Sequence, residues 1–245
     1  MRGVSAIFRR ELAGLFFSPL AWLLFALALA PSGWVFSTAL KEFSGDVTAS
    51  LAFASGGSMF YWAVMLFLPP LVTMRMISEE SRNGLLEFLM TSPVSDAAVV
   101  LGKFLAAWTF LALLWASTLV YALTLEGLGV APDWPPVVGG YVGALLVSAL
   151  FLSIGLLSSS LFSTPALSAF MSLCGSLVVL FLPPLVGLFD FPWLHATVAE
   201  VDVLAHFQRS FQIGVLDTQV LLFFSAWAGF FLFLTVRSVE ARRWS

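Results

Sequence analysis

The sequence predicts an all-α polytopic membrane protein with six transmembrane helices. Hydrophobic residues make up 60% of the chain and charged residues only 10%, whereas soluble domains carry about 25% charged residues. Stretches without Asp, Glu, Lys or Arg cover 12–40, 47–74, 104–125, 134–189 and 218–236. A helix crosses the hydrocarbon core with about 20 residues, so the fourth stretch is long enough for two spans. We therefore expect one transmembrane domain over 1–245, surrounded mainly by lipid.

The first segment, 1–18, combines apolar residues at helical spacing with basic residues on the opposite side. The apolar positions are Val4, Ile7, Phe8, Leu12, Leu15 and Phe16, and the basic ones are Arg2, Arg9 and Arg10. This pattern predicts an amphipathic helix in the membrane interface, leading through Ser18 and Pro19 into the first span. A plain cytoplasmic extension of that span is the alternative.

A cleavable signal peptide ending at Ala30 is a further interpretation of the same region. Its apolar run is nearly twice as long as a usual signal-peptide core, and Pro31 follows directly. We therefore expect the segment to be retained.

The six spans are expected near 19–40, 57–77, 98–124, 138–160, 166–188 and 217–237. Residues 163–165, Ser-Thr-Pro, mark the break inside the longest uncharged stretch. The second and fifth spans both contain FLPPLV, with the proline pairs Pro69, Pro70 and Pro183, Pro184. Proline removes a backbone hydrogen bond and clashes with the preceding turn, so both spans should kink there. Gly139, Gly140 and Gly143 predict close helix packing in the fourth span, within the chain or across a dimer.

The distribution of basic residues predicts the orientation. If the N-terminus, 75–103, the 158–165 loop and the C-terminus share one side, that side holds nine of the eleven Lys and Arg residues. The positive-inside rule makes this side cytoplasmic, with both termini inside. Acidic outer loops then account for the net charge of −3, which gives no sign of nucleic-acid binding.

The chain shows no motif for catalysis or metal binding. Gly102-Lys103 is followed by Phe104 and lacks the other residues of a P-loop. His195 and His206 do not have metal-ligand spacing. No carboxylate pair lies within a span, where ion-coupled transport would need one, and the single Cys174 forms no intramolecular disulfide. We expect no active site, cofactor or metal in this chain.

Charged residues gather between Arg75 and Lys103, which hold seven of the chain's 25 Asp, Glu, Lys and Arg residues. Arg75, Glu79 and Arg82 have the spacing of helical ion pairs, so the second span should continue as a helix into the cytosol. Beyond it, an apolar stripe that the bilayer no longer covers is made by Leu85, Phe88 and Leu89.

We interpret 78–97 as a docking element, because exposed apolar patches rimmed by charge are typical of contact surfaces. Ser92 is suited to cap the next helix and Pro93 to begin it, while Lys103 can extend its amine to the interface. The alternative is a solvated loop whose charges only determine the topology.

Residues 69–107 resemble the cytoplasmic segment of ABC-2 type transporter permeases, and most closely those of the gliding-motility-associated branch. They read PPLVTMRMISEESRNGLLEFLMTSPVSDAAVVLGKFLAA. The matching features are Thr73-Met74-Arg75, Glu79-Glu80, Arg82, Gly84, Leu85, Glu87, Thr91-Ser92-Pro93-Val94-Ser95 and Gly102-Lys103. The stretches FRRELAGLFFSPLAW, AHFQRSFQIGVLD and FLFLTVRSVEARRW are also similar, so the resemblance extends over essentially the whole chain. One departure lies in Gly84-Leu85-Leu86-Glu87, where a Thr before Leu is commoner.

The resemblance implies a permease subunit that dimerises with a second copy or a paralogue. Each copy would dock on a separate cytosolic ATPase, which binds the ATP and Mg, with 78–97 as the coupling helix. The charged rim of that contact would be Glu79, Glu80, Arg82 and Glu87, and its apolar centre Leu85, Phe88 and Leu89. Residues 189–216 would form short re-entrant helices on the outer face. The complex would be an exporter in the bacterial inner membrane, in contact with membrane lipid.

Two alternative functions stay open at this point. The chain could anchor an ABC-type complex that powers assembly of cell-surface or gliding machinery without classical transport. A membrane-embedded enzyme acting on lipids is the other alternative, and it lacks any polar constellation at membrane depth. The uncharged spans favour lipidic or amphipathic cargo over ions.

Overall fold

The computed structural model describes residues 2–84, 95–186 and 200–242. These ranges are 86% helical and contain no β-strand. Within them, six helices are long and apolar enough to cross a membrane. Each expected span coincides with one of them, so the prediction of an all-α polytopic membrane protein is confirmed.

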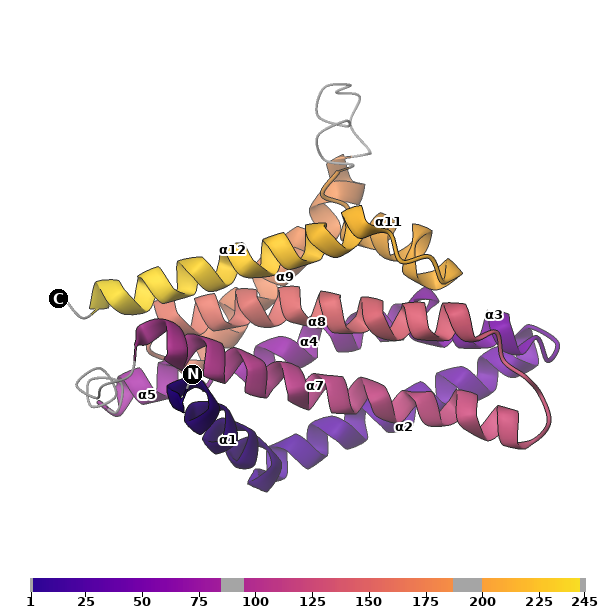
Figure 1. The fold of residues 1–245 in the computed structure, drawn as a ribbon, viewed down its shortest axis with the longest axis horizontal. Helices are drawn as coiled ribbons and strands as arrows, with labels where there is room; N and C mark the ends of the chain where they lie inside the picture. The colour runs from indigo at the N-terminus through magenta and orange to yellow at the C-terminus, as the bar shows by residue number, and fades with distance from the viewer. Residues whose placement is uncertain (1, 85–94, 187–199, 243–245) are drawn as a thin grey trace.

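The first two helices meet at a sharp corner, which Figure 1 shows as a V. Helix α1 comprises Arg2–Phe17 and α2 comprises Pro19–Glu42, and only Ser18 separates them. Pro19 occupies the first turn of α2, where its missing N–H is not needed. The expected amphipathic helix is therefore present, and its apolar side packs against the protein, where Ile7 is buried.

The second span is built from several short pieces. These are α3 (Val47–Ala52), the π-helical η1 (Phe53–Gly57), α4 (Met59–Thr73) and α5 (Ser78–Arg82). Ser58 caps α4 by accepting a hydrogen bond from the Tyr61 N–H at 3.2 Å. Four turn residues separate α4 from α5, so the expected continuous helix into the cytosol is wrong. A reason is that Ser78 and Ser159 take up the backbone groups that a continuous helix would pair.

The remaining helices follow with short connections. They are α7 (Asp96–Gly127), α8 (Trp134–Leu161), α9 (Pro165–Val186), α11 (Val203–Arg209), the 3₁₀ turn η2 (Phe211–Ile213) and α12 (Thr218–Arg242). The expected break at 163–165 lies between α8 and α9. Helix α7 begins at Asp96 and its N-cap is Ser95, whose hydroxyl accepts from the Ala98 N–H. The cap expected at Ser92 and the helix start expected at Pro93 lie outside the described residues.

Helix α8 is the central helix of the bundle and contacts α4, α7, α9 and α12. Most of the buried residues of α8 are Gly, Ala or Ser, and such small side chains let neighbouring backbones come close. A Cβ on Gly143 would lie 2.6 Å from the Phe207 ring and 2.7 Å from the Phe211 ring. The expected close packing is thus made within the chain, against α11 and η2.

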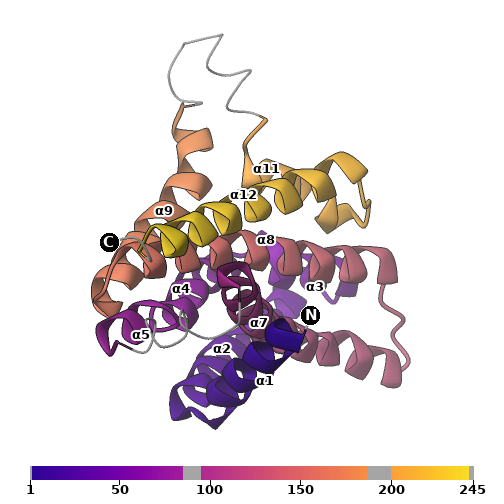
Figure 2. The ribbon, with the colours of Figure 1, turned by 60° about the vertical axis from the view of Figure 1, so that its left-hand side comes forward.

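Figures 1 and 2 show how the helices are distributed around α8. The N-terminus, the C-terminal end of α12 and α5 lie toward one end of the bundle, and α3 lies at the other (Figure 1). The C-terminal turns of α9 extend away from the other helices in both views. Large apolar side chains such as Trp22, Trp34, Phe170 and Phe230 are exposed on the outer helices, as expected of surfaces that face lipid or another subunit.

Replacing Gly143 by Ala should lower the stability of the protein by about 1–3 kcal/mol, because the added methyl group overpacks two buried rings. Gly229→Ala is the matched control, since a Cβ there meets nothing within 4 Å and Ala favours the helix by up to about 1 kcal/mol. Thermal unfolding in detergent measures both. Equal melting temperatures for the two variants would contradict the proposed packing.

Candidate functional site

Four charged side chains from three helices form one ion-pair cluster at the end of the bundle that holds α5. Arg10 Nη2 lies 2.6 Å from Glu11 Oε1 and 2.8 Å from Glu80 Oε1. Lys103 Nζ lies 3.0 Å from Glu11 Oε1 and 2.9 Å from Glu80 Oε2. Two cations and two carboxylates thus neutralise one another. The cluster joins α1, α5 and α7 at a single point.

The Lys103 side chain is the most deeply buried member, with 1% of its surface exposed. A buried ammonium is costly unless it is paired, so its two carboxylates are a requirement of the fold. The structure corrects the expectation that this amine extends to the interface, because the amine is enclosed by Glu11 and Glu80. Glu80 Oε2 is itself buried, and Lys103 is the partner that neutralises it.

Close packing of α1 on α7 brings Glu11 to Lys103. A Cβ on Gly102 would lie 2.8 Å from the Ile7 side chain and 3.1 Å from the Val4 carbonyl oxygen. Only a residue without a side chain lets the two helices approach this closely. Gly102 therefore allows α1 to approach α7 closely, and Lys103 binds α1 through its ion pair with Glu11.

Ser159 of α8 fixes the start of α5. Its hydroxyl accepts hydrogen bonds from the backbone N–H groups of Ile77, at 3.1 Å, and Ser78, at 3.0 Å. The same hydroxyl lies 3.5 Å from the Met74 carbonyl oxygen, to which the Ser78 side chain also donates. Helix α5 is thus held at its first turn by the central helix and at Glu80 by the ion-pair cluster.

The cluster shifts the titration of its members on α1. Burial by itself would raise the pKa of Glu11, but the charges of Lys103 and Arg10 and their hydrogen bonds together lower it below its usual value. The hydrogen bond from Arg10 to Glu11 raises the pKa of Arg10, and the charges of Glu11 and Glu80 act in the same direction. Both groups are therefore ionised at neutral pH.

The residues predicted to contact the ATPase differ in their exposure, and some of them lie outside the described residues. Glu80 is turned inward into the cluster, with 14% of its side chain exposed. Glu79 and Arg82 are exposed on α5, and neither pairs with another side chain in the described ranges. Leu85, Glu87, Phe88, Leu89 and Pro93 lie outside the described residues.

The two proline pairs lie within helices. Pro69 and Pro70 belong to α4, and Pro183 and Pro184 belong to α9. Thr73, one turn after Pro69, donates its hydroxyl hydrogen to the Pro69 carbonyl oxygen at 2.8 Å. The kinks at these positions stay a prediction.

Arg10, Glu11, Gly102 and Ser159 were not singled out from the sequence as members of this site. The sequence does contain a signal for Gly102 and for Ser159. Gly102 is a small residue beside the charged Lys103 at the start of a span. Ser159 belongs to a run of three serines that ends α8. Neither signal says which distant helix supplies the partner.

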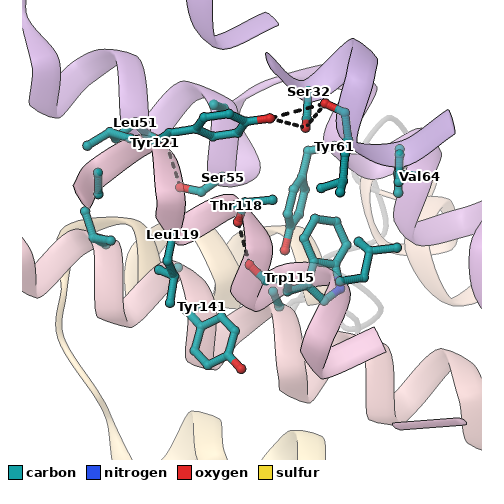
Figure 3. A pocket seen from close by; sticks show the side chains of 18 of the residues that line it. Ser32, Leu51, Ser55, Tyr61, Val64, Trp115, Thr118, Leu119, Tyr121 and Tyr141 are labelled. Carbon is teal, nitrogen blue, oxygen red and sulfur yellow. Dashed lines mark hydrogen bonds between the residues drawn. The ribbon is translucent and has the colours of Figure 1, made fainter. Parts of the chain in front are cut away.

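Two cavities lie near these elements. One, of about 60 Å³, is enclosed by α2, α3, α4, α7 and α8 and lined by uncharged residues (Figure 3). In it, the Tyr121 hydroxyl donates to the Leu29 carbonyl oxygen at 3.2 Å, and the buried Tyr61 hydroxyl has no partner among the described residues. The other, of about 390 Å³, lies beside the ion-pair cluster between α1, α2 and α4. Within the described ranges, no group of three or more His, Cys, Asp or Glu side chains could hold a metal ion.

Comparison with protein families gives a match over most of the chain. The sequence model described as ABC-2 family transporter protein matches residues 45–236. This range includes Glu80, Lys103 and Ser159, whereas Arg10 and Glu11 on α1 precede it. No curated protein matches the chain.

Replacing Lys103 by Met should destabilise the protein by about 3 kcal/mol, because two partly buried carboxylates would be left with Arg10 alone. Lys41→Met, at an exposed position, should change the stability by less than about 0.5 kcal/mol. Thermal unfolding in detergent compares them. In the double variant Glu11→Gln, Lys103→Met the loss should be smaller than the sum of the single losses, since the residues act together. Additive losses would show that they do not interact.

The lowered pKa of Glu11 predicts a dependence of stability on pH. Because the folded-state pKa lies below the unfolded one, the ionised Glu11 stabilises the protein above the unfolded value of about 4.3. That contribution is lost as the pH falls through the folded-state pKa. The difference in melting temperature between the native chain and Glu11→Gln should therefore be full at pH 7 and shrink below about pH 4.3. A difference that stays constant down to pH 3 would contradict it.

Proposed function

The chain belongs to the ABC-2 family of transporter proteins, and from this premise we propose that it is the permease subunit of an exporter driven by a separate cytosolic ATPase. Members of this family are multi-pass membrane subunits and are not themselves the ATPase. A cytosolic ATPase partner follows for the family in general. ATP and Mg would then be bound by that partner.

The attachment of α5 is the observation that carries the proposal. An element that transmits force must be held firmly to the helices that it moves. Helix α5 is tied to α1 and α7 through Glu80, and to α8 through the Ser159 hydroxyl. A push on α5 would therefore reach the interfacial helix and two spans at once.

We assign the docking contact to the segment 78–97 that begins with α5. Its apolar centre would be Leu85, Phe88 and Leu89, with Arg82 and Glu87 on the rim and Pro93 near its end. Glu80 then has a different role, because it anchors the segment to the membrane domain while Arg82, Glu87 and the apolar centre meet the ATPase.

The proposed transport cycle needs two copies of the chain, or this chain and a paralogue. ATP binding in the partner would rock the two between inward-facing and outward-facing states. The uncharged lining of the cavity in Figure 3 and the apolar spans support lipidic or amphipathic cargo. The basic residues favour placing α5 and both termini in the cytoplasm. The sequence resemblance supports a bacterial inner membrane as the location of the domain.

Transport can be distinguished from an anchoring role. The sequence resembles the gliding-motility-associated branch, for which powering of surface machinery is the second candidate. An exporter should show ATP-dependent movement of a labelled amphiphile across vesicles that contain the whole complex. An anchor should hydrolyse ATP without such movement.

Charge reversal in the segment tests the docking assignment. Glu87→Lys should abolish co-purification of the ATPase while membrane insertion is unchanged, because it reverses a rim charge. Glu80→Lys should have the same effect by another route, since a third cation in the cluster would displace α5. Affinity purification from membranes measures the bound ATPase.

Glu240→Lys is the matched control, because Glu240 lies on α12 at the same end of the bundle and pairs only with Arg237 in the described ranges. It should leave ATPase co-purification unchanged. Normal complex formation in both Glu80→Lys and Glu87→Lys would refute the docking assignment.

A further inference from the structure

The cavity of about 390 Å³ beside the ion-pair cluster has an apolar wall and a charged mouth. Its wall is contributed by α1, α2, α4 and α7 and includes Leu15, Leu24, Leu71, Val72 and Phe110. Its polar rim includes Arg75, Glu79 and Asn83, all of which are exposed. A space with this division matches a molecule that has an apolar chain and a polar head.

Only some of the charged side chains at the mouth are free to pair with the head group of such a molecule. Glu11 and Glu80 also line the cavity, but Arg10 and Lys103 already neutralise them. Arg75 and Glu79 have no ion-pair partner in the part of the chain that the structure describes, although they are four residues apart. The turn between α4 and α5 interrupts the helix that would bring them together. One cation and one anion are thus left at the rim.

We propose that this cavity binds a zwitterionic phospholipid whose head carries a phosphate and a primary ammonium group. The Arg75 guanidinium pairs with the phosphate, for which its geometry is well suited. The Glu79 carboxylate pairs with the ammonium group. An acyl chain lies along the apolar wall between α2 and α4.

The position of the cavity along the membrane normal agrees with a phospholipid ligand. Arg75 follows the last residue of α4 by two positions, and the cavity reaches Gly14 and Ser18 at the end of α1. An amphipathic helix lies at the level of the lipid head groups. The lipid site therefore depends on the proposed placement of α1 in the interface, and it does not depend on the ATPase.

The two rim charges make the site selective among common lipids. Phosphatidylglycerol offers the phosphate but no ammonium, so it leaves Glu79 unpaired beside its own negative charge. Phosphatidylcholine offers a quaternary ammonium, which has no N–H to donate. A charge-assisted hydrogen bond corresponds to about a tenfold difference in affinity or more. We expect phosphatidylethanolamine to bind about tenfold more tightly than either.

This selectivity can be measured by native mass spectrometry of the delipidated full-length chain in detergent, titrated with each of the three lipids. Arg75→Gln should weaken phosphatidylethanolamine and phosphatidylglycerol alike, by about tenfold. Glu79→Gln should remove the preference for phosphatidylethanolamine over phosphatidylglycerol. Equal binding of all three lipids to the native chain would overturn the proposal.

A variant that fills the cavity tests the location of the site. Gly14 lines the cavity, and a Cβ added to it meets nothing within 4 Å, so the leucine side chain of Gly14→Leu starts in open space beside the cavity. It should reduce phosphatidylethanolamine binding about tenfold, by excluding the chain. Gly229→Leu on α12 is the matched control and should bind like the native chain. Unchanged binding to Gly14→Leu would overturn the assignment to this cavity.

The same variants distinguish the lipid site from the docking contact, at whose rim the family resemblance places Glu79. Arg75→Gln and Glu79→Gln should still co-purify with the ATPase. Loss of the ATPase in Glu79→Gln, with lipid selectivity retained, would overturn the inference and return Glu79 to the docking surface. Lipid selectivity that follows these two residues would support the site even if the ATPase assignment fails.

Discussion

The buried ammonium group of Lys103 is the constraint on which this end of the molecule depends. A charge enclosed by protein must be neutralised where it lies, and the two carboxylates that do so come from α1 and α5. Because those helices are distant in sequence, the requirement of one side chain determines the relative position of three elements. A hydrophobic residue at 103 would remove the cost of burial, but it would also remove the reason for Glu11 and Glu80 to meet.

Small residues make the cluster possible. Gly102 lets the backbone of α1 approach α7 closely enough for Glu11 to reach Lys103. On α8, the short side chain of Ser159 accepts hydrogen bonds from the backbone N–H groups at the start of α5. In lipid the hydrophobic effect does not drive helices together, so close contact and satisfied polar groups must supply the association. The close contact holds α1 against α7, and the satisfied polar groups attach α5 to both of these helices and to α8.

The interruption after α4 has a consequence for function. A continuous helix would bring Arg75 and Glu79 together. The turn instead allows Glu80 to enter the cluster and leaves Arg75 and Glu79 at the rim of a cavity. The attachment of the proposed coupling element and the proposed lipid site therefore share one structural origin.

The sequence by itself determined the fold class, the six spans and the amphipathic α1, because uncharged length and helical spacing respond to the bilayer and not to any particular neighbour. It also determined the break at 163–165 and the small-residue character of α8. Tertiary structure decided what no local pattern encodes: that Glu80 turns inward, that Lys103 is enclosed, and that Ser159 holds the start of α5. The physical reason is that a charge or a hydroxyl group in a low-dielectric interior takes its position from its partner, and here those partners lie 23 to 92 positions away.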